Sequence, residues 1–137
     1  MNTPTTSAPV DTLAAGLELP PLLVPPINRT TLALFAGASG DHNPIHIDID
    51  AAHAAGLEDV FAHGMLSMAH VGRMLTNWVA QERIRSLSAR FVAITPVGAE
   101  LTCTGRVVAV DNGLATVEYM ITLSDGTTTV TGEATVS

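Results

Sequence analysis

The chain has 137 residues, of which six are basic and thirteen acidic, so its formal net charge is −7 at neutral pH. All six basic residues are arginine, which argues against the broad cationic face that DNA, RNA or an anionic membrane would require. Hydrophobic residues make up 47% of the chain and charged residues 14%, a composition too apolar for a mostly disordered protein. With so few charges, we expect another subunit to cover part of the surface.

Cysteine usage and targeting signals both favour a cytoplasmic protein. Cys103 is the single cysteine, so one chain contains neither a disulfide framework nor a multi-cysteine zinc site. The first basic residue is Arg29, so the charged start of a secretory signal is missing. No apolar run approaches the roughly 18 residues that a membrane-spanning helix needs.

The chain is predicted to form one domain that follows a flexible N-terminal tail. Residues 1–18 are rich in threonine, proline and alanine, and we expect a flexible N-terminal tail there. Residues 19–137 are expected to form the single folded domain. Two proline pairs restrict residues 19–26 to extended conformations, so this segment is at most an edge strand.

Three helices are predicted in the first half of the domain. A short helix is expected over residues 31–36, and a second over 50–55, capped by Asp50. The strongest helical pattern runs from residue 64 to about residue 81, and its wide apolar sector predicts burial on more than one side. Gly72 lies inside this helix, where glycine costs about 1 kcal/mol against alanine. A close approach of backbone or ligand would explain it.

The second half of the domain is predicted to be β. Asp111-Asn112-Gly113 and Ser124-Asp125-Gly126 are strong hairpin signals, and the segment after each of them alternates apolar and polar residues. Residues 83–95 and 100–110 indicate two further strands. We therefore expect a four-stranded antiparallel meander with the long helix across its apolar face, which is an α+β domain.

All five histidines lie within residues 42–70: His42, His46, His53, His63 and His70. A metal site is one interpretation, because His42 and His46 would share a face of a helix. Pro44 lies between them and makes a continuous helix improbable in this segment. We therefore predict no metal ion.

Acid–base catalysis is a second interpretation. Asp41 and His46 lie five residues apart across a turn, and a loop can aim both side chains at one point. A carboxylate beside an imidazole supplies a base and its orienting partner near neutral pH. The alternative is ordinary turn chemistry, in which Asp41 caps backbone amides. Spacing alone leaves both interpretations open.

A third feature lies at the predicted start of the long helix, where His63, Gly64 and Met65 follow one another. The first amides of a helix lack partners within the helix and lie at the positive end of its dipole. A glycine lets a ligand oxygen approach this backbone closely. Gly64 is therefore either a simple cap or, opposite the Asp41–His46 pair, part of a site that polarises a carbonyl.

These segments resemble the MaoC-like family, which contains the (R)-specific enoyl-CoA hydratases and 3-hydroxyacyl-thioester dehydratases. Residues 35–46, with Gly-Asp-x-Asn-Pro-x-His, resemble the hydratase motif, and residues 62–66, Ala-His-Gly-Met-Leu, resemble the second signature. Residues 90–91 and 96–98 resemble the strand and turn after the central helix. The resemblance implies a hotdog fold: a long helix wrapped by an antiparallel sheet, usually paired with a second such domain.

The resemblance also implies roles for individual residues. Asp41 and His46 fall on the catalytic dyad, and Gly64 on the residue whose backbone N–H holds the thioester oxygen. Asn43 falls on a position that supports the loop of the dyad. His63 belongs to the second signature and is expected to be structural. His42 falls on a variable position, so it is expected to be exposed and not catalytic.

The implied activity is reversible syn addition of water to a trans-2-enoyl thioester, or dehydration of the (R)-3-hydroxyacyl thioester, without a cofactor. One alternative is the catalytic subunit of a heteromeric dehydratase that acts on a bulky or long acyl chain. Another is a hotdog thioesterase, which is disfavoured because the expected helix over residues 64–81 contains no Asp or Glu.

The expected partners are a thioester and a second hotdog subunit. The acyl group is carried by coenzyme A or by acyl carrier protein, and the assembly is a homodimer or a heterodimer. Residues on the long helix are expected to line the acyl slot or to be ordinary core residues: Met65, Leu66, Met68 and Gly72.

Overall fold

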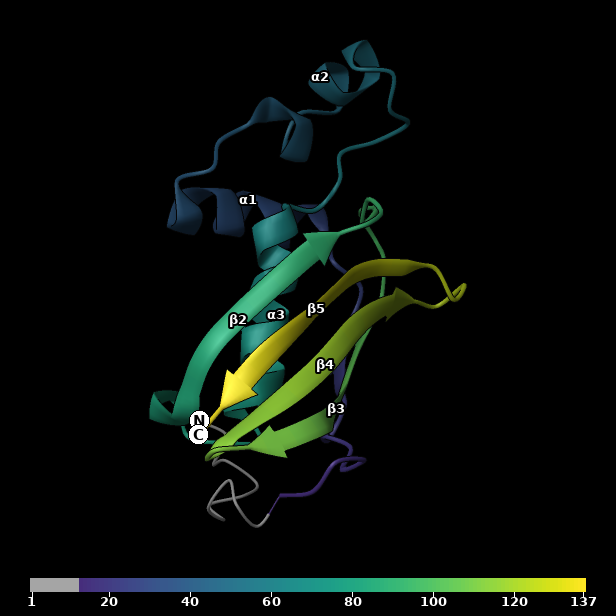
Figure 1. The fold of residues 1–137 in the computed structure, drawn as a ribbon. Helices are drawn as coiled ribbons and strands as arrows, with labels where there is room; N and C mark the ends of the chain where they lie inside the picture. The colour runs from purple at the N-terminus through teal and green to yellow at the C-terminus, as the bar shows by residue number, and fades with distance from the viewer. Residues whose placement is uncertain (1–12) are drawn as a thin grey trace.

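The computed structural model describes residues 13–137, which form a five-stranded antiparallel sheet with the strand order β1-β3-β4-β5-β2. The elements follow one another as β1 (Leu22–Val24), α1 (Arg29–Ser39), η2 (Pro44–His46), α2 (Ile49–Ala54), α3 (Gly64–Thr76), η3 (Gln81–Arg83), β2 (Ile84–Phe91), β3 (Leu101–Asp111), β4 (Leu114–Leu123) and β5 (Thr128–Val136). Helix α3 runs along one face of the sheet, and α1 and α2 lie beyond its N-terminal end (Figure 1). The α+β prediction is confirmed.

The two predicted hairpins form where their turn residues indicated. Asn112 and Gly113 have φ values of 50° and 76°, which a two-residue turn of type I′ needs to join β3 to β4. In the turn between β4 and β5, Gly126 has a φ of 88°, and an Asp125 side-chain oxygen accepts a hydrogen bond from the Thr127 backbone N–H at 2.9 Å. Local turn chemistry thus sets the registers of β3–β4–β5.

The position of β2 differs from the predicted meander. β2 is the first strand after α3, yet it pairs with β5 at one edge of the sheet and not with β3. The neighbours of β3 are β4 and the short strand β1. In the connection after β2, Pro96 forms an isolated antiparallel bridge with Phe61, which lies before α3. The chain then returns to β3. Alternation in a strand predicts its buried face but does not specify its neighbour, so the prediction of a sequential four-stranded meander is wrong.

Helix α3 is shorter than predicted. It ends at Thr76, and the chain turns before it enters η3. Trp78 and Val79 are 3% and 0% exposed, so they fill the core from this turn. Ala80 has an extended backbone, with φ −62° and ψ 142°. The apolar pattern continued past the helix because the turn is buried as deeply as the helix.

The two shorter helices have side-chain caps. Asn28 begins α1 by accepting a hydrogen bond from the Thr31 N–H at 2.8 Å, and Gly40, with a φ of 78°, ends it. The cap of α2 is Asp48, which accepts from the Asp50 N–H at 2.9 Å. Asp50 lies in the first turn of α2, so the predicted cap was two residues too late.

The core lies between α3 and the sheet. Val71, Met74 and Leu75 of α3 are fully buried, as are Val107 of β3 and Val117 of β4. Near Gly72, in contrast, a Cβ would meet no atom of the described residues within 4 Å. The close approach of backbone that would explain Gly72 is therefore not found among the described residues.

The predicted tail is only partly within the described residues, because residues 1–12 lie outside them. Gly16 donates a backbone hydrogen bond to the Val107 carbonyl at 2.7 Å, and Val107 donates to the Leu17 carbonyl at 2.8 Å. Leu19, which is 4% exposed, donates to the Gly105 carbonyl. The chain is thus held against β3 from Gly16 onward.

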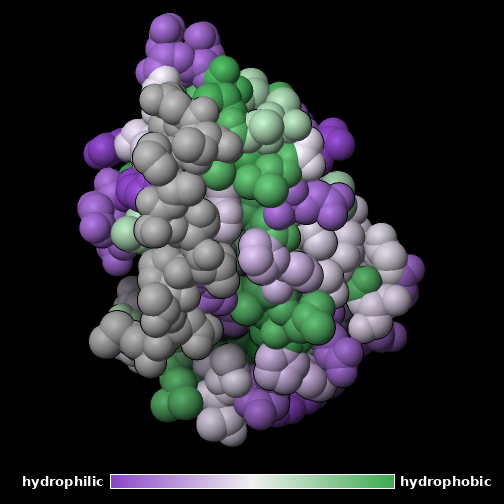
Figure 2. All heavy atoms as spheres, turned by 90° about the horizontal axis from the view of Figure 1, so that it is seen from below, coloured by the Kyte–Doolittle hydropathy of each residue, from purple (hydrophilic) through white to green (hydrophobic). Residues whose placement is uncertain are grey.

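The surface is mixed in polarity. Seen from the end of the molecule opposite α2, hydrophobic side chains reach the surface between hydrophilic ones (Figure 2). No helix within residues 13–137 is long and apolar enough to cross a membrane.

Candidate active site

The loop from Asp41 to His46 is built by two successive side-chain caps. After Gly40 ends α1, the Oδ1 atom of Asp41 accepts a hydrogen bond from the Asn43 N–H at 3.2 Å. Asn43 in turn accepts from the Ile45 N–H at 3.3 Å, which starts η2. Asp41 therefore does serve the turn. Its second oxygen, Oδ2, lies 4.0 Å from the Nε2 atom of His46. One oxygen of Asp41 therefore serves the turn and the other faces His46.

His46 is held in one orientation. Its side chain is 8% exposed, and its Nδ1–H donates a hydrogen bond to the Phe61 carbonyl at 2.8 Å. Because a carbonyl only accepts, this bond places the proton of the neutral ring on Nδ1 and leaves a lone pair on Nε2. The Phe61 ring lies edge-on to the imidazole, with centroids 4.8 Å apart. His46 therefore presents an unprotonated nitrogen toward Asp41.

The separation of 4.0 Å between Asp41 Oδ2 and His46 Nε2 is too long for a direct hydrogen bond. Both atoms accept hydrogen bonds in the neutral-imidazole state, so a water molecule can donate one O–H to each. Asp41 is 49% exposed at its side chain, which leaves this position open from one side. The pair is therefore arranged to bind and polarise water.

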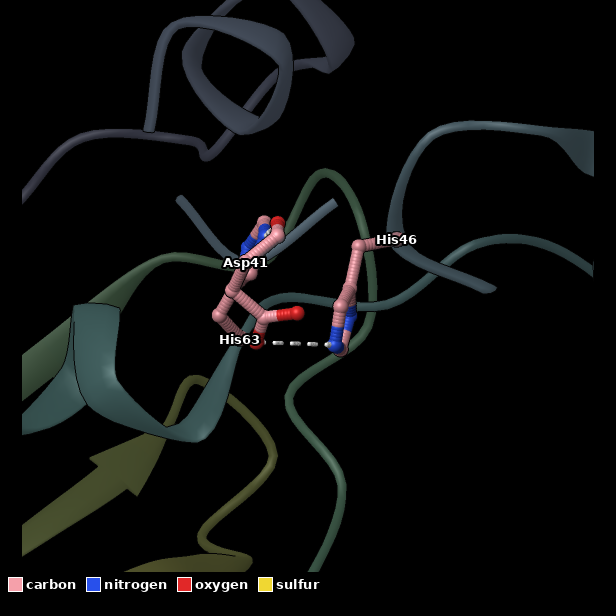
Figure 3. A group of neighbouring side chains, drawn as sticks. All are labelled: Asp41, His46 and His63. Carbon is pink, nitrogen blue, oxygen red and sulfur yellow. Dashed lines mark hydrogen bonds and ion pairs between the residues drawn. The ribbon is translucent and has the colours of Figure 1, made fainter. Parts of the chain in front are cut away.

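His63 packs against both members of the pair, as Figure 3 shows. It is 1% exposed, and its Nε2–H donates to the Asp41 backbone carbonyl at 3.1 Å. Its ring stacks on His46, with centroids 4.0 Å apart and planes inclined by 25°. The edge-on ring of Phe35 lies 4.9 Å away. Thus the residue directly before α3 contacts the loop of the dyad.

The N-terminal end of α3 is left open for a ligand. His63 provides no side-chain cap, and the first turn contains no acidic residue. Gly64 is exposed, and its N–H has no hydrogen-bond partner among residues 13–137. Phe91 at the end of β2 lies over it, with three ring atoms 3.1 to 3.3 Å from where a Cβ would be. A side chain at this position would push against Phe91.

Asp41, His46 and His63 are also the one group of potential metal ligands found among the described residues, with one atom from each within 4.8 Å of the others. An imidazole binds a metal ion in the plane of its ring. The rings of His46 and His63 are stacked, so their lone pairs lie in two separate, nearly parallel planes. This arrangement does not direct both nitrogens at one ion, and the three residues do not fit a metal centre.

The other predicted residues are distributed around this site. His42 is exposed. Of the expected acyl-slot residues, Leu66 is 7% exposed and packs in the core, whereas Met65 is 56% exposed and Met68 is intermediate. The sequence patterns did not identify Phe61 and Phe91 as site residues, although Phe61 lies two residues before His63. A cavity of 630 Å³ lies over the outer face of β3, β4 and β5 and includes no dyad residue.

Burial of neutral imidazoles predicts a pH-dependent stability. Burial lowers the pKa of His63 against the opposing effect of its hydrogen bond to the Asp41 carbonyl, and burial also lowers the pKa of His70. The unfolded chain therefore binds more protons than the folded protein between these lowered values and about 6.5. The stability that these neutral imidazoles contribute should be fully present above about pH 6.5. The free energy of unfolding should therefore fall as the pH drops below that value.

Denaturant titrations between about pH 8 and about pH 5 measure this dependence. The variant His70→Gln should make the decline shallower, because it removes one of the two titrating groups. The exposed His42 offers a matched control, and His42→Gln should leave the slope unchanged. A free energy of unfolding that rises on acidification through this window would contradict the assignment.

Comparisons with known proteins identify the family. The model of the MaoC like domain matches residues 11–129. The chain is 32% identical over 103 residues to fatty acid synthase subunit beta of Saccharomyces cerevisiae, covering 73% of this chain and 5% of that protein. It is 29% identical over 102 residues to 3-hydroxyacyl-thioester dehydratase Z of Mycobacterium tuberculosis, covering 69% and 68% respectively.

Solved structures show the same fold. The (R)-hydratase from A. caviae involved in PHA biosynthesis superposes with a TM-score of 0.81 at 28% identity, covering 92% of this chain and 97% of that one. A chain of the ChsH1-ChsH2 complex from Mycobacterium tuberculosis gives 0.83 at 28% identity, covering 92% and 98%. With the sheet wrapped around α3, these likenesses confirm the predicted hotdog fold. The family match extends over most of the described residues, and the chain belongs to the MaoC-like domain family.

Proposed function

We propose that this protein is a hydro-lyase that adds water reversibly to trans-2-enoyl thioesters and yields (R)-3-hydroxyacyl thioesters. The observation that carries the proposal is the pair of facing acceptors, Asp41 Oδ2 and His46 Nε2, 4.0 Å apart beside the uncapped start of α3. Relatives named as a 3-hydroxyacyl-thioester dehydratase and an (R)-hydratase support the same chemistry.

The first step is activation of water. A water molecule donates one hydrogen bond to Asp41 Oδ2 and one to His46 Nε2, and its oxygen lone pair attacks C3 of the enoyl group. As the C3–O bond forms, Nε2 takes the proton, and Asp41 stabilises the resulting imidazolium. The Nδ1–H bond to the Phe61 carbonyl keeps Nε2 pointed at this water throughout.

The second step is stabilisation of the enolate. The electron pair of the C2–C3 double bond moves toward the carbonyl, so negative charge develops on the thioester oxygen. The Gly64 N–H and the positive end of α3 stabilise that charge, and one such donor contributes about 3 kcal/mol. The imidazolium then returns its proton to C2 on the face where water was added, so the addition is syn. Dehydration runs through the same steps in reverse.

The carrier and the acyl chain are part of the same proposal. The substrate is an acyl-CoA or acyl-ACP thioester, and Met65, Leu66, Met68 and Gly72 lie on the helix that begins at Gly64. Met65 directly follows Gly64 and is 56% exposed, so in this proposal it contacts the acyl chain next to the thioester.

A second hotdog subunit completes the site in this proposal. Apolar side chains remain about half exposed around the end of β2: Met65 56%, Phe91 49%, Val92 49% and Ile94 50%. β2 is also an edge strand, paired on one side only. The partner is a second copy of this chain or, as in the ChsH1-ChsH2 complex, a different subunit. Because this chain contains Asp41, His46 and Gly64, it is the active half of a heteromer.

The test is to mix the purified protein with trans-2-enoyl-CoA substrates of increasing chain length. The conjugated enoyl absorbance should disappear, and chiral analysis of the product should give the (R)-3-hydroxyacyl thioester. Free thiol is measured in parallel, because its release would identify a thioesterase. Enoyl absorbance that persists with every chain length, for the protein alone and with its co-purifying partner, would refute the proposal.

A further inference from the structure

His63 is the most deeply buried polar contact of the proposed dyad, and the mechanism above assigns it no proton. It is 1% exposed and lies one residue before the Gly64 amide. Its three neighbours are the Asp41 carbonyl, the His46 ring and the Phe35 ring. It is therefore the side chain through which the start of α3 contacts the loop of the dyad.

The hydrogen bond of His63 acts on Asp41 through the backbone. The Nε2–H donates to the Asp41 carbonyl at 3.1 Å, across 22 residues of sequence. The other hydrogen bonds of Asp41 lie within its own turn: its backbone N–H donates to the Ser39 hydroxyl, and its Oδ1 accepts from the Asn43 N–H. The His63–Asp41 bond is therefore the one long-range hydrogen bond of Asp41 among the described residues.

The ring of His63 acts on His46 directly. The two imidazoles are stacked with centroids 4.0 Å apart, while Phe61 contacts the edge of His46 and accepts its Nδ1–H. The face of His46 that contacts His63 is therefore covered, and its Nε2 lies 4.0 Å from Asp41 Oδ2. The charged or titratable groups that face His63 among the described residues are Asp41 and His46.

We propose that His63 is a positioning residue that sets the spacing between Asp41 and His46, by holding the Asp41 carbonyl through Nε2–H and by stacking on His46. The positioning role rests on the proposed function, because Asp41 and His46 are the base proposed there. His63 stays uncharged in this role, because its donor nitrogen bonds to a carbonyl and its Nδ1 is buried without a hydrogen-bond partner among the described residues.

Two variants separate the two contacts. His63→Gln places an amide N–H near the position of Nε2 and keeps the bond to the Asp41 carbonyl, but it removes the ring. His63→Phe keeps a ring that can stack on His46, but it removes the donor. His53→Phe is the matched control, because His53 Nε2 also bonds to a backbone carbonyl, that of Glu58 at 2.8 Å, away from the dyad.

The first measurement is turnover of an enoyl-CoA substrate. His63→Phe should lower kcat by about 100-fold with little change in KM, since a shift of about 1 Å in a reacting group has an effect of that size. His63→Gln should recover most of that loss, and His53→Phe should have no effect. Equal losses in His63→Gln and His63→Phe, or full activity in His63→Phe, would overturn the proposal.

The second measurement does not depend on turnover. Crystal structures of the folded variants measure the distance between Asp41 Oδ2 and His46 Nε2, and thermal denaturation reports stability separately. His63→Phe should change this distance by about 1 Å, because the Asp41 carboxylate loses its long-range hydrogen bond, whereas His63→Gln and His53→Phe should keep it near 4.0 Å.

The two measurements distinguish the two proposals. If the wild-type protein hydrates no enoyl thioester and the Asp41–His46 distance still responds to His63→Phe alone, the proposed function fails and the positioning role stands. If that distance is the same in all variants while stability falls, His63 is a packing residue and the positioning role fails.

Discussion

Asp41→Asn should reduce the rate of enoyl-thioester hydration by about 10²- to 10⁴-fold while the protein remains folded. The substitution removes the negative charge that faces His46 Nε2, but the amide oxygen of Asn can still accept the Asn43 N–H that Asp41 Oδ1 accepts. The turn is therefore retained and the catalytic charge is lost. Initial rates with an enoyl-CoA substrate, together with circular dichroism, measure both properties.

His46→Asn should have an effect of similar size for a complementary reason. The Asn amide N–H lies near the position of Nδ1 and can still donate to the Phe61 carbonyl, but the basic Nε2 is gone. His46→Ala removes both groups, so it should lose the same activity and some stability as well. Comparing these two variants separates the loss of the basic Nε2 from the loss of the hydrogen bond to the Phe61 carbonyl.

A matched control exists in the same region. Asp48 caps α2 with the same side-chain geometry, accepting the Asp50 N–H at 2.9 Å, and no hydrogen bond or ion pair joins it to Asp41 or His46 among residues 13–137. Asp48→Asn should therefore leave turnover unchanged. Full activity in Asp41→Asn, or an equal loss in Asp48→Asn, would exclude Asp41 as part of the base.

Gly132→Ala should destabilise the fold by about 3 kcal/mol or more. A Cβ on Gly132 would lie 2.1 Å from the Ser88 carbonyl oxygen and 2.5 Å from the Tyr119 hydroxyl. The Tyr119 hydroxyl donates to the Ser88 carbonyl across this glycine, and β2 and β4 flank β5 at this point. Backbone atoms in the middle of a sheet cannot move aside cheaply, so the added methyl group would separate strands.

The free energy of unfolding from denaturant titration measures this effect. Gly37→Ala is the matched control, because Gly37 lies in α1, is exposed and has no atom within 4 Å of its Cβ position. That substitution should stabilise the protein by about 0.5 to 1 kcal/mol through helix propensity. A Gly132→Ala variant as stable as wild type would show that the strands can shift to accept the methyl group.

Local patterns anticipated the elements and the loop of the site well. Hairpin turns, helix caps and strand alternation depend on neighbouring residues, and they correctly indicated β3, β4, β5 and the approximate positions of α1 and α2. Both interpretations of Asp41, as a turn residue and as a partner of His46, proved compatible, because a carboxylate has two oxygens and each can serve one role.

Longer-range features escaped the sequence patterns. The pairing of β2 with β5 joins strands that are separated in sequence by β3 and β4. The length of α3 depends on Trp78 and Val79 being buried in a turn, which gives the same apolar signal as a helix. The contacts of Phe91 with Gly64 join residues 27 positions apart, and no local rule links them.

The amino-acid sequence by itself determined which residues could do chemistry: an acid and an imidazole on one bend, and a glycine at the start of a helix. It did so because turn and helix-end preferences act over a few residues. Only the tertiary structure decided that His63 bonds to Asp41 and stacks on His46, and that Phe61 accepts the Nδ1–H of His46. Those contacts join segments 15 to 22 residues apart, beyond the range over which turn and helix-end preferences act.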